Sequence, residues 1–258
     1  MSTAVLPAPP SSRGASSRPG LGRLTLVELR KMSDTRAGFW LLASTALLTI
    51  AVAVIACIAM PDEDANLVNF FAISLVPASV LLPVVGILLV TSEWTQRTAM
   101  ITFALVPHRG RVMGAKLLAG MALCIVAYQL CLIVALISTA LVGADGDQTW
   151  SLSLALIGQA VISISVPMIT GIAFGAALLT SAPAIVFYFV LPTAFGIIGS
   201  FKAFEGIAQW LDQSRTMDTL VEETLSGKEW GQLLTSCLLW TALPLAIGLW
   251  RVARSDVR

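Results

Sequence analysis

Long uncharged apolar runs alternate with short polar segments along the chain. Each run is close to the ~20 helical residues that cross a hydrocarbon core. The longest, 148–201, is uncharged throughout and is too long for one crossing. Ser181-Ala182-Pro183 supplies a break, because proline disfavours helix in the residue before it. We therefore predict an all-α polytopic membrane protein with one six-span domain (37–258), whose helices cover about 39–60, 67–91, 117–142, 151–180, 184–201 and 231–250.

Two segments precede the first span. Residues 1–20 are rich in Pro, Ser, Arg and Gly, a composition typical of a disordered tail. Residues 21–36 form an amphipathic pattern, with charged side chains on one helical face and apolar ones opposite. This pattern favours a helix lying along the membrane interface, although a basic flank that merely orients the first span is the alternative.

The segment between the second and third spans predicts a further amphipathic helix over 92–106. Glu93 and Arg97 have the i, i+4 spacing of an ion pair. Trp94, Ile101 and Leu105 fall on one stripe. Such a helix either rests on lipid headgroups or forms a docking surface for a cytoplasmic partner.

Between the fifth and sixth spans, residues 203–229 show two shorter amphipathic patterns. They predict short helices on the outer side, with a structural rather than a ligand-binding role.

The basic residues indicate the orientation. If both termini lie on one side, that side carries thirteen Lys and Arg residues, and the other side carries only Lys202, Arg215 and Lys228. Basic residues concentrate on the cytoplasmic side of membrane proteins. We therefore expect cytoplasmic termini and a multi-pass protein of the cell membrane.

Composition excludes most soluble classes. The chain is 57% hydrophobic and only 12% charged, with a net charge of +1. The predicted spans contain no charged side chain, which argues against ion-coupled transport, voltage sensing and intramembrane proteolysis. No P-loop motif is present, and the four cysteines and His108 form no metal-binding pattern. We expect no enzyme activity, bound cofactor, metal or nucleic acid for this chain alone.

The connecting segment carries a family resemblance. Glu93, Arg97-Thr98, Pro107-x-Arg109-x-Arg111 and Lys116 resemble the motif of type-2 ABC transporter permeases, of the bacterial drug and antibiotic exporter kind. Glu28-Leu29-Arg30-Lys31 is similar to the N-terminal segment of that family. Ala99 and Ala115 replace glycines usual there, and the spacing from Pro107 to Arg109 is one residue shorter.

The resemblance implies the partners. Such permeases pair as homodimers or heterodimers in the bilayer and dock two separate P-loop ATPase subunits, which bind ATP and Mg. It implies that Glu93, Trp94, Arg97, Ile101, Leu105, Arg109 and Arg111 belong to the ATPase-coupling segment. It also implies a substrate path along the first, second and fifth spans, with Asn69, Phe187 and Tyr188 as candidates.

Several alternatives stay open at this point. Gly171-x-x-x-Gly175 permits close helix packing, either within the chain or between two subunits. A non-transporting anchor, or a channel, would also have a partner-recruiting cytoplasmic helix. The uncharged spans favour an amphipathic or apolar cargo.

Overall fold

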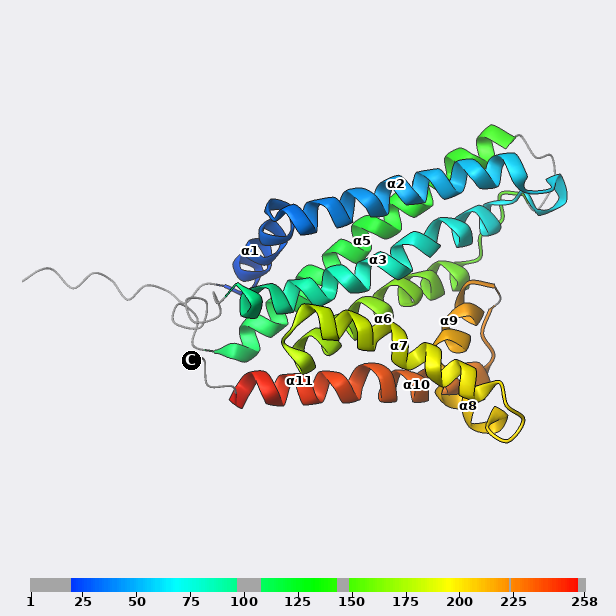
Figure 1. The fold of residues 1–258 in the computed structure, drawn as a ribbon. Helices are drawn as coiled ribbons and strands as arrows, with labels where there is room; N and C mark the ends of the chain where they lie inside the picture. The colour runs from blue at the N-terminus through cyan, green and yellow to red at the C-terminus, as the bar shows by residue number, and fades with distance from the viewer. Residues whose placement is uncertain (1–19, 97–107, 143–148, 223, 255–258) are drawn as a thin grey trace, which may run out of the picture.

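A computed structural model describes residues 20–96, 108–142, 149–222 and 224–254, and within these ranges the regular structure is helical throughout. Figure 1 shows the helices running side by side. The elements are α1 (Leu21–Asp34), α2 (Arg36–Ala59), the 3-10 turn η1 (Asp62–Asp64), α3 (Leu67–Thr95), α5 (Arg109–Val142), α6 (Leu154–Leu178), α7 (Ser181–Gly199), α8 (Glu205–Leu211), α9 (Gln213–Glu222), α10 (Gly227–Cys237), the π-helical η2 (Leu238–Ala242) and α11 (Leu243–Arg254).

Six of these helical units are long and apolar enough to cross a membrane. They are α2, α3, α5, α6, α7 and the continuous stretch α10–η2–α11, with mean hydropathies between 1.7 and 2.6. The prediction of an all-α chain with six membrane-length helices is therefore confirmed for the described residues.

The helix bounds differ from the predicted ranges by a few residues at most ends, and by eight residues at the start of the third membrane helix. The third membrane helix begins at Arg109 rather than at 117, so a basic turn continues directly into the apolar run. Between α6 and α7 the chain turns at Leu179, whose φ of 58° is left-handed and ends α6. Helix α7 then starts at Ser181, which places Pro183 in its first turn, where a missing N–H costs no helical hydrogen bond.

Helices α3 and α6 form the centre of the bundle. Of their apolar stretches, 61% and 67% of residues are buried, against 11% to 28% in the other four membrane-length helices. Glycines bring the two backbones together. A Cβ on Gly86 would lie 2.9 Å from the Met168 carbonyl oxygen, and a Cβ on Gly171 would collide with the Pro83 carbonyl. Gly175 faces Ile87 in the same way. The Gly171-x-x-x-Gly175 pair thus packs within the chain.

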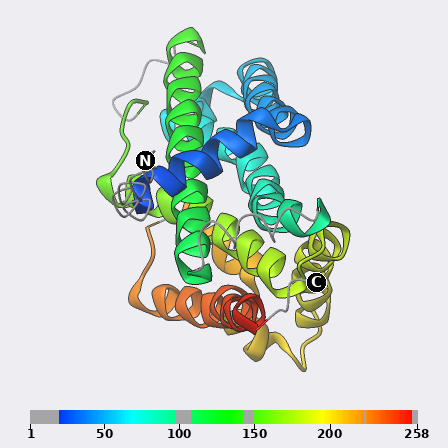
Figure 2. The same cartoon turned by 90° about the vertical axis from the view of Figure 1, so that its left-hand side faces the viewer.

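The bundle has two chemically different ends. At the end where α1 lies, here called the α1 end, α1 runs across the ends of the long helices (Figure 2). The opposite, α8–α10 end holds the short helices (Figure 1). Described basic residues at the α1 end are Arg23, Arg30, Lys31, Arg36, Arg109, Arg111, Lys116, Arg251 and Arg254, and those at the α8–α10 end are Lys202, Arg215 and Lys228.

Hydrogen bonds from membrane helices fasten the short helices. Gln159 of α6 is buried, and its Nε2 donates to the Leu220 carbonyl at 3.1 Å. The Leu225 N–H donates to its Oε1 at 3.3 Å. The Trp240 indole N–H donates to the Leu211 carbonyl at 2.7 Å. Because backbone carbonyls at the ends of α8 and α9 gain donors, both helices are held against the bundle.

We predict that Gly171→Ala destabilises the protein by about 1–3 kcal/mol, because the added methyl forces α3 and α6 apart. Gly158→Ala on the same helix meets no atom within 4 Å and should cause no loss. Thermal unfolding of the two variants in detergent measures the difference. Equal stabilities would contradict the assignment of Gly171 to the central contact.

Candidate functional site

Four charged side chains from three helices meet at the α1 end. The Lys31 Nζ of α1 lies 2.8 Å from Glu28 Oε1 and 2.7 Å from Glu93 Oε1 of α3. The Lys116 Nζ of α5 lies 2.7 Å from Glu28 Oε2 and 3.3 Å from Glu93 Oε1. This charge cluster alternates in sign and links α1, α3 and α5.

Three members of the charge cluster are removed from solvent. The exposed fractions of the Glu28, Glu93 and Lys116 side chains are 5%, 7% and 3%. Lys116 also donates a 2.7 Å hydrogen bond to the Leu89 carbonyl, one turn before Glu93. Isolated buried ions are strongly unfavourable, whereas paired ions with further hydrogen bonds are tolerated. Each buried charge therefore has an oppositely charged partner within the charge cluster.

Lys31 is the accessible member of the charge cluster, with 40% of its side chain exposed. Burial by itself lowers the pKa of this ammonium group, but hydrogen bonds to Glu28 and Glu93 outweigh it and raise the pKa above its ordinary value. Lys31 therefore stays charged across the physiological range.

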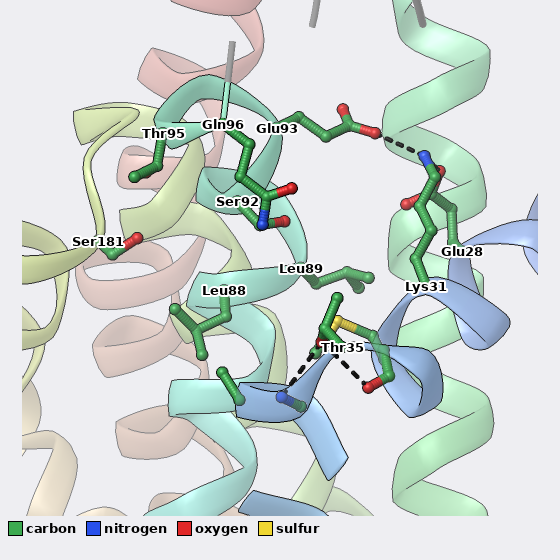
Figure 3. Close-up of a pocket in the computed structure, with 13 residues that line it drawn as sticks. Glu28, Lys31, Thr35, Leu88, Leu89, Ser92, Glu93, Thr95, Gln96 and Ser181 are labelled. Atoms are coloured by element: carbon green, nitrogen blue, oxygen red, sulfur yellow. Dashed lines mark hydrogen bonds and ion pairs between the residues drawn. The ribbon is translucent and has the colours of Figure 1, made fainter. Parts of the chain in front are cut away.

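A cavity of about 430 Å³ lies beside the charge cluster. In Figure 3 it opens between the α1–α2 junction and the C-terminal end of α3, with Ser181 of α7 on its far side. Its wall is both apolar and polar, because the aliphatic side chains of Leu88 and Leu89 lie below Ser92, Glu93 and Gln96. The remaining lining residues are Glu28, Lys31, Met32, Thr35, Ala37, Gly38 and Thr95. Such a surface suits a molecule with an apolar body and a polar end.

The predicted coupling residues are described only in part. Arg97, Ile101 and Leu105 lie outside the described residues. Glu93 is buried, and its carboxylate contacts the two lysines of the charge cluster, so it is turned into the protein. Trp94 follows it, half-buried, in the last turn of α3.

Arg109 and Arg111 lie in the first turn of α5 and are half-buried. The Arg109 Nη1 donates to the Val252 carbonyl at 2.7 Å, near the C-terminal end of α11. A cation at this position offsets the negative end of the helix dipole. Residues 97–107 are thus flanked on one side by the charge cluster and on the other by a contact with α11.

The candidate path residues are dispersed. Asn69 lies in the first turn of α3, and its Nδ2 donates to the Asp64 carbonyl at 2.8 Å. Phe187 of α7 is 45% exposed on the outside of the bundle. Tyr188 packs edge-on against Phe174 of α6, with ring centroids 6.2 Å apart. The structure therefore brings Tyr188 to α6 but does not gather these three residues around one cavity.

Sequence reasoning did not recognise the charge cluster. From the sequence, Glu28, Lys31 and Lys116 have a role only through the family resemblance, and the predicted Glu93–Arg97 pair stays a prediction because Arg97 lies outside the described residues. The sequence feature that indicates such a cluster is the presence of opposite charges immediately beside apolar runs, since a charge that enters a helix bundle needs a counter-ion. Choosing the partners required the tertiary structure, because Glu28 and Lys116 are 88 residues apart in sequence.

Comparison with known proteins does not identify a family. No protein-family model matches the chain, and no curated protein matches it.

We predict that Lys116→Met lowers the free energy of unfolding by about 3–5 kcal/mol, because Glu28 and Glu93 lose their buried counter-ion. Lys31→Met should cost less, since Lys31 is partly hydrated and Lys116 remains beside both carboxylates. Unfolding in detergent, followed by tryptophan fluorescence, compares the two.

The double variant Glu28→Leu with Lys116→Met removes one charge of each sign. It should recover much of the loss of Lys116→Met, because the Lys31–Glu93 pair stays neutral. A double variant as unstable as the sum of its single changes would show that the charge cluster is not electrostatically coupled.

Proposed function

We propose that the chain is the membrane-spanning permease subunit of an ATP-driven exporter of the type-2 ABC class. In this proposal a separate P-loop ATPase supplies the energy, and the permease moves an amphipathic or apolar molecule out of the cytoplasm or the inner leaflet. The observation that carries the proposal is the charge cluster. It joins α1, α3 and α5 where α3 gives way to the connecting segment 97–107 and α5 begins after it.

Charge distribution supports the orientation that this function needs. Nine described basic residues lie at the α1 end and three at the α8–α10 end. By the positive-inside rule the α1 end faces the cytoplasm. In this proposal the connecting segment 97–107 is on the side where ATP is available, and the protein resides in the cell membrane with cytoplasmic termini.

The contacts that hold both flanks of the connecting segment support its proposed role in coupling ATP hydrolysis to movement of the membrane helices. Packed side chains and salt-bridge networks can carry coupling from a docking segment to the membrane helices. The side chains of Glu93 and Arg109 anchor the flanks to different helices, α1 and α5 on one side and α11 on the other. In the proposed mechanism, ATP-driven movement of docked residues such as Trp94, Arg97, Ile101 and Leu105 is passed through these anchors to the bundle.

The chemistry of the bundle supports an external energy source and an amphipathic cargo. Charged side chains are absent from the apolar runs in the sequence, so no proton or sodium relay is available there. The cavity at the charge cluster combines aliphatic walls with polar and ionic groups. Two such subunits, with two ATPase subunits, would complete the transporter, and the exposed apolar face of α7 around Phe187 would lie against lipid or the second permease.

Copurification and ATPase activity test this function. A P-loop ATPase should copurify with the full-length chain from its native membrane, and the complex should hydrolyse ATP. Trp94→Asp combined with Ile101→Asp should reduce this ATPase activity by at least about tenfold, because a charge in an apolar contact weakens docking. Trp150→Asp, at an exposed position of the opposite end, is the control and should leave it unchanged.

Unchanged ATPase activity in the double variant would contradict docking through this segment. If no ATPase copurifies, the alternatives gain support. A channel would pass current in a bilayer without ATP, and an anchor would bind its partner without any flux.

A further inference from the structure

A second cavity lies among the short helices at the α8–α10 end. It has a volume of about 310 Å³ and is lined from three helices by Gln209 of α8, Arg215, Thr216 and Thr219 of α9, and Lys228, Glu229 and Gln232 of α10. All seven residues are polar. This wholly polar lining contrasts with the chain as a whole, which is 57% hydrophobic.

Positive charge is concentrated in this cavity. It holds two of the three basic residues at the α8–α10 end, Arg215 and Lys228, and both are exposed. Neither side chain has a carboxylate within 4 Å among the residues that the structure describes. The surrounding end is acidic, because eleven of the fifteen Asp and Glu residues fall in its segments of the sequence. The Lys228 charge acts on the neighbouring Glu229, and the N–H groups of Arg215 and Lys228 can donate charge-assisted hydrogen bonds to an anion in the cavity.

Glu229 is the acidic residue among those lining the cavity, and its carboxylate already accepts a hydrogen bond. The Glu229 Oε2 accepts a 2.6 Å hydrogen bond from the Ser226 N–H, which holds the carboxylate at the start of α10. The cavity therefore keeps a net charge of +1 from Arg215, Lys228 and Glu229. Gln209, Gln232 and Thr219 add neutral donors and acceptors around it.

We propose that this cavity binds a phosphate group, with the Arg215 guanidinium and the Lys228 ammonium as its main ligands. A planar guanidinium donates two parallel hydrogen bonds to an oxyanion, and an ammonium group adds a point charge. The side-chain amides of Gln209 and Gln232 complete the hydrogen bonding. The cavity lies at the end opposite the charge cluster, and its ligand binding is independent of ATPase docking. The phosphate group belongs either to a soluble anion or to a phospholipid headgroup, because both present the same oxygens.

Binding is measured on the full-length chain in neutral detergent with inorganic phosphate as the probe, at constant ionic strength set with sodium chloride. Phosphate should raise the unfolding temperature in a saturable manner, since a ligand of the native state stabilises it. Arg215→Gln and Lys228→Gln should each weaken the apparent affinity by at least about tenfold, because each removes a charge-assisted hydrogen bond. Arg215→Lys should retain part of the affinity for phosphate.

Lys202→Gln is the matched control, because Lys202 is the third basic residue of this end and does not line the cavity. It should bind like the wild type.

Reconstitution distinguishes the two sources of phosphate. Nanodiscs containing phosphatidylglycerol, compared with nanodiscs of phosphatidylcholine alone, test the anionic headgroup. If only phosphatidylglycerol stabilises the wild type, and Arg215→Gln and Lys228→Gln abolish this stabilisation, the ligand is the headgroup. If inorganic phosphate suffices, the ligand is a soluble anion. Absence of saturable stabilisation by both probes, or equal losses in Lys202→Gln, would overturn the proposal.

Discussion

The buried Lys116 ammonium group constrains the whole α1 end of the molecule. Because 3% of its side chain is exposed, its burial is tolerated only beside counter-ions, and Glu28 and Glu93 supply them from two other helices. The position of α1 across the bundle follows from this requirement, since displacing α1 would take Glu28 away from Lys116. Lys31 then neutralises the second negative charge while keeping contact with water.

The α3–α6 contact provides the rigid support for that arrangement. Small residues allow two backbones to approach so closely that a Cβ on Gly86 would lie 2.9 Å from a carbonyl oxygen. In a bilayer, where lipid tails are as apolar as the side chains, packing of this kind drives helix association. The end of α3 that carries Glu93 is thereby fixed relative to the centre of the bundle, and the connecting segment beyond it starts from a defined position.

The two ends differ in how polar groups are satisfied. At the α1 end, ions neutralise one another at buried positions and leave a cavity with both apolar and ionic walls. At the α8–α10 end, neutral side chains such as Gln159 satisfy backbone groups, while Arg215 and Lys228 stay in a polar cavity. The α1 end therefore buries paired ions, whereas the α8–α10 end leaves two exposed cations in a polar cavity.

The amino-acid sequence alone determined the fold class, because the length and apolar character of each run depend only on local composition. It determined the uneven distribution of basic residues for the same reason. The tertiary structure decided which charges from different helices meet, since Glu93 of α3 contacts Lys31 of α1 and Lys116 of α5. It also decided that Gly171 serves packing within the chain, and that Arg215 and Lys228 share one cavity. These outcomes depend on contacts between helices far apart in sequence, and helical periodicity carries no information about which faces meet.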